Sequence, residues 1–349
     1  MNNVESKRLQ GVEESSTLAM AALAREYKLK GIDVISLSLG EPDFKTPKHI
    51  CEGAKTAIDS GQYFSYPPVP GYLDLREAIS KKFKDENNLF YNPSDIIVSN
   101  GVKHSITNVM FSILNKGDEV LVFAPFWVSY SAIIKLADGV PVYINSTIEN
   151  DFKPTPEQLK KSITNKTKAI IFSSPCNPTG TVFSKKDLEN YSDILIDYPN
   201  IIIISDEIYE HINFTEEHFS IGSLEGMADR TITLNGFSKG FAMTGWRLGY
   251  LGAPSKIAKS INKMQGQTTS ANCSIAQRAG LIALNGGNDC ALKMKREYLK
   301  RRDIFYNLLS KIEKLTLNKP QGAFYFFPEI TNYLGNKTEE GKKISSAND

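Results

Sequence analysis

The sequence has few of the residues that characterise metal-binding or disulfide-rich proteins. Its 349 residues include only four cysteines, four histidines and two tryptophans. The cysteines and histidines are scattered along the chain, without the paired spacing that is typical of metal ligands. We therefore expect no metal site, and we expect the four thiols to be reduced, as in a cytoplasmic protein.

The sequence also lacks a strong excess of one charge and any long apolar run. Lysine and arginine total 41 against 39 acidic residues, a formal charge of +2, so no nucleic-acid partner is implied. No apolar run is long enough to span a bilayer, and residues 1–7 do not resemble the start of a secretory signal. We expect a soluble, cytoplasmic protein with no membrane partner.

Apolar segments of strand length recur along the chain, mostly separated by stretches long enough for a helix. Hydrophobic residues make up 41% of the sequence, which is enough for a sizeable core. The alternation is typical of a largely parallel sheet covered by helices. The expected strands are Asp95–Val98, Glu119–Ala124, Val140–Asn145, Lys168–Phe172, Asn200–Ser205, Arg230–Leu234 and Gly249–Gly252.

A glycine-rich break at residues 286–288 suggests a division into two domains. The sequence predicts a large domain over residues 48–286 and a small domain formed by residues 1–47 and 287–349. A long helix is expected from Asp289 to Leu315, because apolar residues recur there with helical spacing.

Lys239 is the candidate catalytic residue with the most informative surroundings. It follows an expected strand within a segment rich in glycine and serine, and Arg247 lies eight positions later. Gly236 and Gly240 let the backbone turn tightly and approach a ligand. A lysine amine can bond to an aldehyde, and a guanidinium suits a phosphate; pyridoxal phosphate (PLP) carries both groups. A single loop lysine is more often merely solvated, so other segments must support this reading.

Two further strand ends carry side chains that suit the same cofactor. Asp206 follows four consecutive isoleucines and can pair with a protonated pyridine nitrogen, although it could instead cap the next helix. Tyr209 comes one turn later and could reach the ring hydroxyl. Asn177 begins an Asn-Pro-Thr-Gly segment after another apolar strand, a pattern that on its own usually marks only a turn.

The remaining strand ends suit the phosphate and the ring of PLP. The segment Gly101-Val102-Lys103 should open a helix, whose first backbone N–H groups can bind phosphate. Trp127 follows the expected strand at 119–124 and could stack on a flat ring, although a lone tryptophan is more often part of a core or surface. Five strand ends thus suit a single ligand.

Taken together, these motifs resemble those of the fold-type I PLP enzymes, and within them the class I/II aminotransferases close to the bacterial aspartate aminotransferases. The resemblance runs from about Lys7 to the end and includes Gly40-Glu41-Pro42-Asp43-Phe44 and the segment from Tyr63 to Arg76. It implies an α/β fold, the PLP-dependent transferase fold of type I. In that fold a mostly parallel seven-stranded sheet carries helices on both faces, and a smaller α+β domain is attached.

The resemblance also implies a role for each motif residue. The catalytic residues would be Lys239, as Schiff-base lysine and proton carrier, with Asp206 and Tyr209. The cofactor would be held by Gly101, Val102, Lys103, Trp127, Asn177, Asp206, Tyr209, Ser238, Lys239, Arg247 and, reaching the phosphate of a partner subunit, Tyr66. The substrate would lie against Gly40, Trp127 and Asn177.

Two features depart from the family pattern. Gly236 stands where many relatives carry a hydroxyl residue, so the phosphate should depend more on Ser238 and Arg247. The family also continues for several tens of residues beyond Tyr325 and carries there an arginine that grips the substrate α-carboxylate, whereas no arginine follows Arg302 here. We expect the chain to be part of a longer protein, with its small domain incomplete.

The predicted function is transamination from an amino acid, first of all aspartate, to a 2-oxo acid, first of all 2-oxoglutarate. The predicted enzyme is a homodimer with shared active sites. Two alternatives stay open: a PLP-dependent C–S β-lyase, which would use the same lysine and electron sink, and a PLP-binding protein without catalytic activity.

Overall fold

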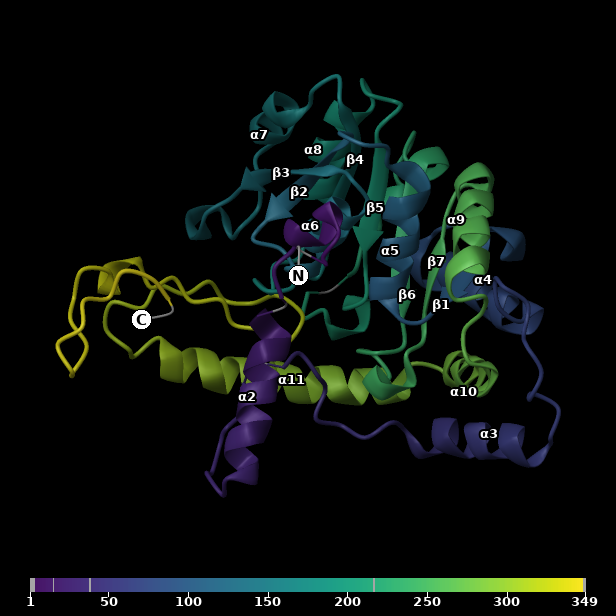
Figure 1. The fold of residues 1–349 in the computed structure, drawn as a ribbon, viewed down its shortest axis with the longest axis horizontal. Helices are drawn as coiled ribbons and strands as arrows, with labels where there is room; N and C mark the ends of the chain where they lie inside the picture. The colour runs from purple at the N-terminus through teal and green to yellow at the C-terminus, as the bar shows by residue number, and fades with distance from the viewer. Residues whose placement is uncertain (1–3, 15, 38, 216, 348–349) are drawn as a thin grey trace.

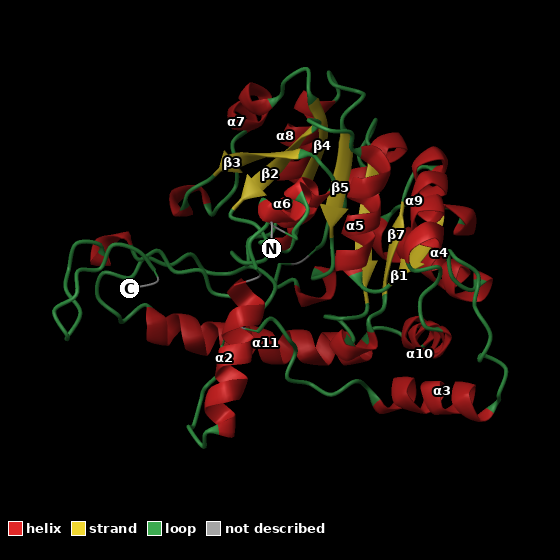
Figure 2. Ribbon diagram, viewed as in Figure 1, coloured by secondary structure: helices red, strands yellow, loops and turns green. Residues whose placement is uncertain are grey.

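A single seven-stranded sheet forms the centre of the computed structural model, which describes residues 4–14, 16–37, 39–215 and 217–347 (Figures 1 and 2). The strand order is β1-β7-β6-β5-β4-β2-β3, and only β7 runs antiparallel to its neighbours, β1 and β6. The strands are β1 (Ile96–Ser99), β2 (Glu119–Ala124), β3 (Val140–Asn145), β4 (Thr167–Ser173), β5 (Ile202–Asp206), β6 (Thr231–Gly236) and β7 (Gly249–Gly252). The prediction of a mostly parallel seven-stranded sheet is confirmed.

Helices flank this sheet and continue beyond it. They are α1 (Lys7–Gln10), α2 (Ser16–Leu29), α3 (Lys48–Asp59), α4 (Leu73–Asn87), α5 (Val102–Ile113), α6 (Ser129–Leu136), α7 (Pro156–Ser162), α8 (Lys185–Leu195), α9 (Ser255–Thr268), α10 (Ser274–Asn285) and α11 (Asp289–Leu309). Helix α11 ends before the predicted Leu315, and Lys314 has a φ of 67°, which a helix does not allow. None of the described helices has the length and apolar character needed to cross a membrane.

The core explains why most of the strands are largely apolar. Val120 and Val122 of β2 pack in one cluster with residues of α5, α6 and α9, whereas Leu121 and Phe123 pack in another with residues of α7 and α8. Successive side chains of a strand point to opposite faces, so both faces of the sheet are covered. A third cluster joins β1 and β7 to α3, α4 and α10.

The parallel strands β2, β4, β5 and β6 end at the same edge of the sheet. Figure 1 shows the arrow of β5 pointing toward the side where α11 runs, and α11 packs against the short helix η3 (Glu210–Ile212) that follows β5. Beyond α11 the described chain pairs through isolated bridges, such as Thr316 with Glu329. The division into domains at residues 48 and 286 stays a prediction.

Candidate active site

Lys239 lies in the turn after β6, and most of its side chain is shielded from solvent. Its amine donates to the backbone carbonyl of Gly40 and lies 5.5 Å from the ring centroids of Tyr209 and Phe324. Burial lowers the pKa of Lys239 to about 8, although the charges of Glu41 and Asp206 oppose that shift. A larger fraction of this amine is therefore neutral and nucleophilic near pH 7 than of an ordinary lysine.

Asp206 is the last residue of β5 and is only 3% exposed. The hydroxyl of Tyr130 donates to Oδ2 at 2.6 Å, and the N–H of Ile208 donates to Oδ1 at 3.3 Å. Burial raises the pKa of Asp206 to about 6, while both hydrogen bonds and the charge of Lys239 favour the carboxylate. A carboxylate in this setting gains from a cationic partner such as a protonated pyridine nitrogen.

Tyr209, Asn177 and Tyr325 bring polar groups together beside Lys239. The hydroxyls of Tyr209 and Tyr325 are hydrogen-bonded to each other, and Nδ2 of Asn177 donates to the Tyr325 hydroxyl at 3.4 Å. Burial raises the pKa of both tyrosines, so they stay protonated and can donate. A Cβ at Gly40 would lie 2.2 Å from the Tyr325 hydroxyl, so the glycine makes room for this tyrosine.

A cradle of backbone and guanidinium groups forms where α5 begins. Gly101 precedes the helix with a φ of 87°, and no side chain caps the first turn, which contains Val102 and Lys103. The guanidinium of Arg247 donates to the carbonyl of Asn100 at 3.2 Å, and a Cβ on Gly101 would lie 2.7 Å from its Nη2. A helix N-terminus beside a guanidinium suits a phosphate group.

The ammonium of Lys103 lies near the ring of Trp127. Nζ of Lys103 lies 5.0 Å from the centroid of the Trp127 ring, a distance at which the two attract each other. Burial and the nearby charge of Arg247 both lower the pKa of Lys103. The edge of Tyr130 packs against the same indole, with ring centroids 5.7 Å apart. Trp127 therefore lies beside Tyr130, the residue that donates to Asp206.

The structure gathers most of the predicted site residues at one edge of the sheet. Ser238 is half-buried directly before Lys239. Tyr66 does not join this group, since it is 96% exposed, and its predicted role toward a partner subunit stays a prediction. Gly236 is explained by packing, because a Cβ there would lie 2.9 Å from Cα of Gly249 in the neighbouring strand.

Sequence reasoning missed two residues, Tyr130 and Tyr325. Tyr130 lies three positions after Trp127, and this helical spacing is the one signal that could have linked it to the site. Tyr325 belongs to an aromatic run, 324–327, whose contacts with residues more than a hundred positions earlier leave no local pattern.

The donor groups fit PLP. Lys239 offers an amine to the aldehyde and Asp206 a carboxylate to the ring nitrogen. Tyr209 and Asn177 offer donors to the ring oxygen, and the Gly101–Arg247 cradle would hold the phosphate.

Comparisons with known proteins agree on one family. The family model "Aminotransferase class I and II" matches residues 32–345. A probable aspartate/prephenate aminotransferase of Rickettsia typhi is 42% identical over 348 residues, which cover 99% of this chain and 87% of the relative. The bifunctional aspartate aminotransferase and glutamate/aspartate-prephenate aminotransferase of Petunia hybrida is 43% identical, with 95% and 70% covered. The solved aspartate aminotransferase of Rhizobium meliloti superposes with a TM-score of 0.95 at 37% identity, with 99% and 87% covered.

Proposed function

Because this chain belongs to the class I and II aminotransferases, a PLP-dependent family, we propose that it moves an amino group from aspartate to 2-oxoglutarate, with the amine of Lys239 bonded to the cofactor. The observation that carries this proposal is the pairing of a buried amine with a buried acid. Lys239 and Asp206 are close enough for each charge to shift the pKa of the other. An acid and an amine that lie close together and both have shifted pKa values are typical of catalytic sites.

Lys239 acts as the proton carrier in this proposal. PLP, when bound, supplies an electron sink for the negative charge that forms when a substrate loses its α-proton. Nζ of Lys239 accepts that proton in its neutral form, which its lowered pKa of about 8 makes more available than in an ordinary lysine, and afterwards donates it back. The carbonyl of Gly40 and the rings of Tyr209 and Phe324 orient the amine and keep water away.

Asp206 keeps the ring nitrogen protonated. The hydrogen bonds from Tyr130 and from the N–H of Ile208 hold the carboxylate in place and favour its charged form. Tyr209 and Asn177 would donate to the ring oxygen, and Trp127 would lie against the ring. The first turn of α5, Ser238 and Arg247 would hold the phosphate.

The position of Lys103 favours an acidic substrate. Its ammonium lies near the Trp127 ring, which forms part of the proposed substrate site. An aspartate side chain placed against this ring would meet the ammonium, and so would the second carboxylate of 2-oxoglutarate. Because the names of several relatives include prephenate, we also propose prephenate as an acceptor.

We further propose a cytoplasmic homodimer in which Tyr66 extends toward the phosphate of the other subunit. Tyr66 and two other large apolar side chains of the same chain segment, Phe64 and Leu73, are each more than half exposed, and a second copy could cover them. We also propose that residues 48–286 form the large domain, and residues 1–47 and 287–349 the small one. Analytical ultracentrifugation tests the dimer.

The absorbance of the PLP-bound protein tests the reaction. Excess aspartate should convert the cofactor to its amino form, and 2-oxoglutarate should restore the original spectrum. Lys239→Ala should abolish this exchange, whereas Lys259→Ala, which changes an exposed lysine of α9, should not. No spectral exchange in the unmodified protein would contradict the proposal, and pyruvate and ammonia from a cysteine conjugate would instead indicate the lyase.

A further inference from the structure

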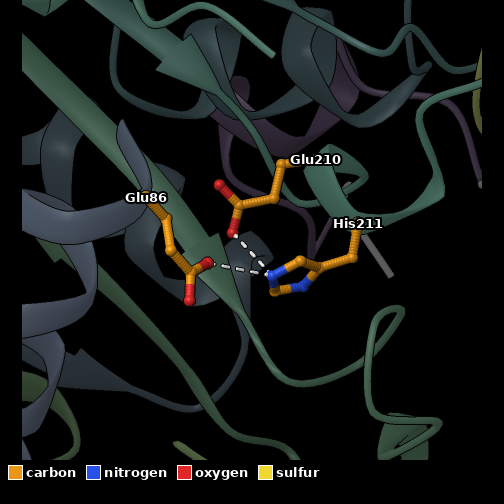
Figure 3. A group of neighbouring side chains, drawn as sticks. All are labelled: Glu86, Glu210 and His211. Carbon is orange, nitrogen blue, oxygen red and sulfur yellow. Dashed lines mark hydrogen bonds and ion pairs between the residues drawn. The ribbon is translucent and has the colours of Figure 1, made fainter. Parts of the chain in front are cut away.

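A cluster of charged side chains, several of them buried, lies between α4 and the segment that carries Asp206 and Tyr209. Figure 3 shows part of it: Glu86, at the end of α4, faces Glu210 and His211 of η3. Nε2 of His211 lies 3.1 Å from a carboxylate oxygen of Glu86 and 3.7 Å from one of Glu210.

Glu207 is the most strongly hydrogen-bonded member of this cluster. Its Oε2 accepts from Nε2 of His218 at 2.9 Å, from the hydroxyl of Ser220 at 2.6 Å and from Nδ2 of Asn87 at 3.1 Å. Its Oε1 accepts from the hydroxyl of Ser205 at 2.9 Å. Burial disfavours a charged imidazole, but the carboxylate of Glu207 outweighs it and raises the pKa of His218. Glu207 and His218 therefore favour an ion pair, which forms when the imidazole is protonated.

Glu210 is held by two residues of α4, Lys82 and Asn87. It forms an ion pair with the ammonium of Lys82, and its Oε2 accepts from Nδ2 of Asn87 at 2.8 Å. Both Lys82 and Glu210 are buried, and Nζ of Lys82 also donates to Oδ1 of Asn87 at 2.7 Å. Burial opposes the charge of Glu210, but Lys82, His211 and His218 lower its pKa to about 2.

The carboxylates and imidazoles of this cluster are close enough to be metal ligands. They form two groups, Glu86 with Glu210 and His211, and Glu207 with Glu210 and His218, each with ligand atoms within 4.8 Å of one another. The ammonium of Lys82, however, is paired with Glu210 and lies 3.7 Å from Glu86. Lys82 already supplies the positive charge that a metal ion would bring, so we interpret the cluster as a network of ion pairs.

The segment from Asp206 to Glu210 directs its polar side chains to two different sides. Asp206 and Tyr209 contact Tyr130 and Tyr325 of the proposed site, whereas Glu207 and Glu210 contact α4. After β5 ends, the backbone of this segment is held to the sheet by the N–H of Glu207, which donates to Leu234 at 2.9 Å. In the residues that follow, the N–H groups of Glu210 and Ile212 donate to Glu207 and Tyr209, and the side-chain contacts to α4 add to these backbone bonds in orienting the segment.

We propose that Lys82, Asn87 and His218 are positioning residues of the transaminase, which pair with Glu207 and Glu210 and thereby hold Asp206 and Tyr209 toward the cofactor. This inference rests on the proposed roles of Asp206 and Tyr209. The buried carboxylates gain their partners only when the segment has one orientation, because an unpaired buried charge is strongly disfavoured. The cluster thus acts on the reaction through two other residues and touches neither cofactor nor substrate.

Two variants test the inference. Glu207→Gln keeps the shape of the side chain and removes its charge, and Lys82→Met removes the partner of Glu210. The control is Lys81→Met, which changes an exposed lysine of α4 that is paired with Asp85. The measurements are the Kd for PLP, the pH titration of the visible absorbance of the PLP-bound protein, and the separate values of kcat and KM for aspartate.

Both variants should weaken PLP binding about tenfold, the scale of coupling between neighbouring residues. They should also move the midpoint of the absorbance titration by about half a pH unit or more, because a displaced Asp206 interacts differently with the ring nitrogen. We expect kcat to fall more than KM changes, and the control to match the unmodified protein.

A lower unfolding temperature combined with an unchanged PLP Kd and absorbance titration would overturn the inference, since the cluster would then only stabilise the fold. If Lys82→Met does not fold, Glu207→Gln decides by the same two measurements. Neither measurement needs turnover. The inference can therefore fail while the protein transaminates aspartate, and it can hold while aspartate is not a substrate.

Discussion

The hydroxyl of Tyr130 donates a hydrogen bond of 2.6 Å to Asp206, across 76 residues of sequence and from a helix to the end of a strand. Both side chains are buried, so water cannot replace either partner in this hydrogen bond. The bond favours the carboxylate form of Asp206 against the effect of burial. Tyr130 thus helps to keep Asp206 negatively charged, as the proposed mechanism requires.

Replacing Tyr130 with Phe should lower kcat by about ten- to a hundredfold, because a hydrogen bond to a buried charged group contributes roughly 1.5–3 kcal/mol. Steady-state kinetics with aspartate measure the effect. Tyr143→Phe is a matched control, since that hydroxyl bonds to Ser131 on the exposed surface. Equal rates for both variants would show that Asp206 does not depend on Tyr130.

The charge of Asp206 should destabilise the protein when PLP is absent. Its pKa is raised by burial to about 6 in the folded state, from 3.8, so the contribution of Asp206 to stability is fully present below pH 3.8 and is lost as the pH rises through 6. Asp206→Asn should therefore raise the unfolding free energy of the cofactor-free protein at pH 7.5 by up to about 3 kcal/mol.

Urea unfolding of both cofactor-free proteins at pH 5 and pH 7.5 measures this difference. The gain from Asp206→Asn should be smaller at pH 5, where more of the folded Asp206 is protonated. A difference that is independent of pH would contradict the prediction. The same substitution should lower kcat, since Asn carries no charge to hold the ring nitrogen protonated.

Lys103→Met should impair acidic substrates selectively. Loss of the ammonium near Trp127 should raise KM for aspartate about tenfold, the scale of one charge-assisted hydrogen bond. An apolar donor such as phenylalanine should be affected much less. Lys116→Met changes an exposed lysine and is the control. A parallel loss for both substrates would place Lys103 in cofactor binding rather than in substrate recognition.

Gly101→Ala should weaken PLP binding by about tenfold or more. The new Cβ would lie 2.7 Å from Nη2 of Arg247, and the backbone of Gly101, with φ 87° and ψ 163°, is itself strained for alanine by roughly 1–3 kcal/mol. Gly117→Ala separates the two effects, because Gly117 has the same φ of 87° and no atom within 4 Å of its Cβ position. Fluorescence titration with PLP compares the two variants, and equal affinities would rule out the proposed cradle.

The sequence by itself determined the strands of the sheet and the positions of Lys239 and Asp206. Strands covered on both faces are mostly apolar, and the more exposed edge strand β3 is also an apolar segment, so each of the seven could be predicted to within two residues. The parallel strands end at one edge, and the residues at or just after their ends, Trp127, Asn177, Asp206 and Lys239, therefore come together. These features depend on local composition and on strand direction, both of which can be inferred from the sequence.

Only the tertiary structure decided which side chains complete the site. Tyr325 meets Tyr209 across 116 residues, and Lys82 meets Glu210 because α4 packs beside the end of β5. The scattered histidines and glutamates suggested no cluster in the sequence, yet folding brings four of them, Glu207, Glu210, His211 and His218, within reach of Lys82 and Glu86. Such contacts depend on how helices pack against the sheet, and neither spacing nor composition encodes that packing locally.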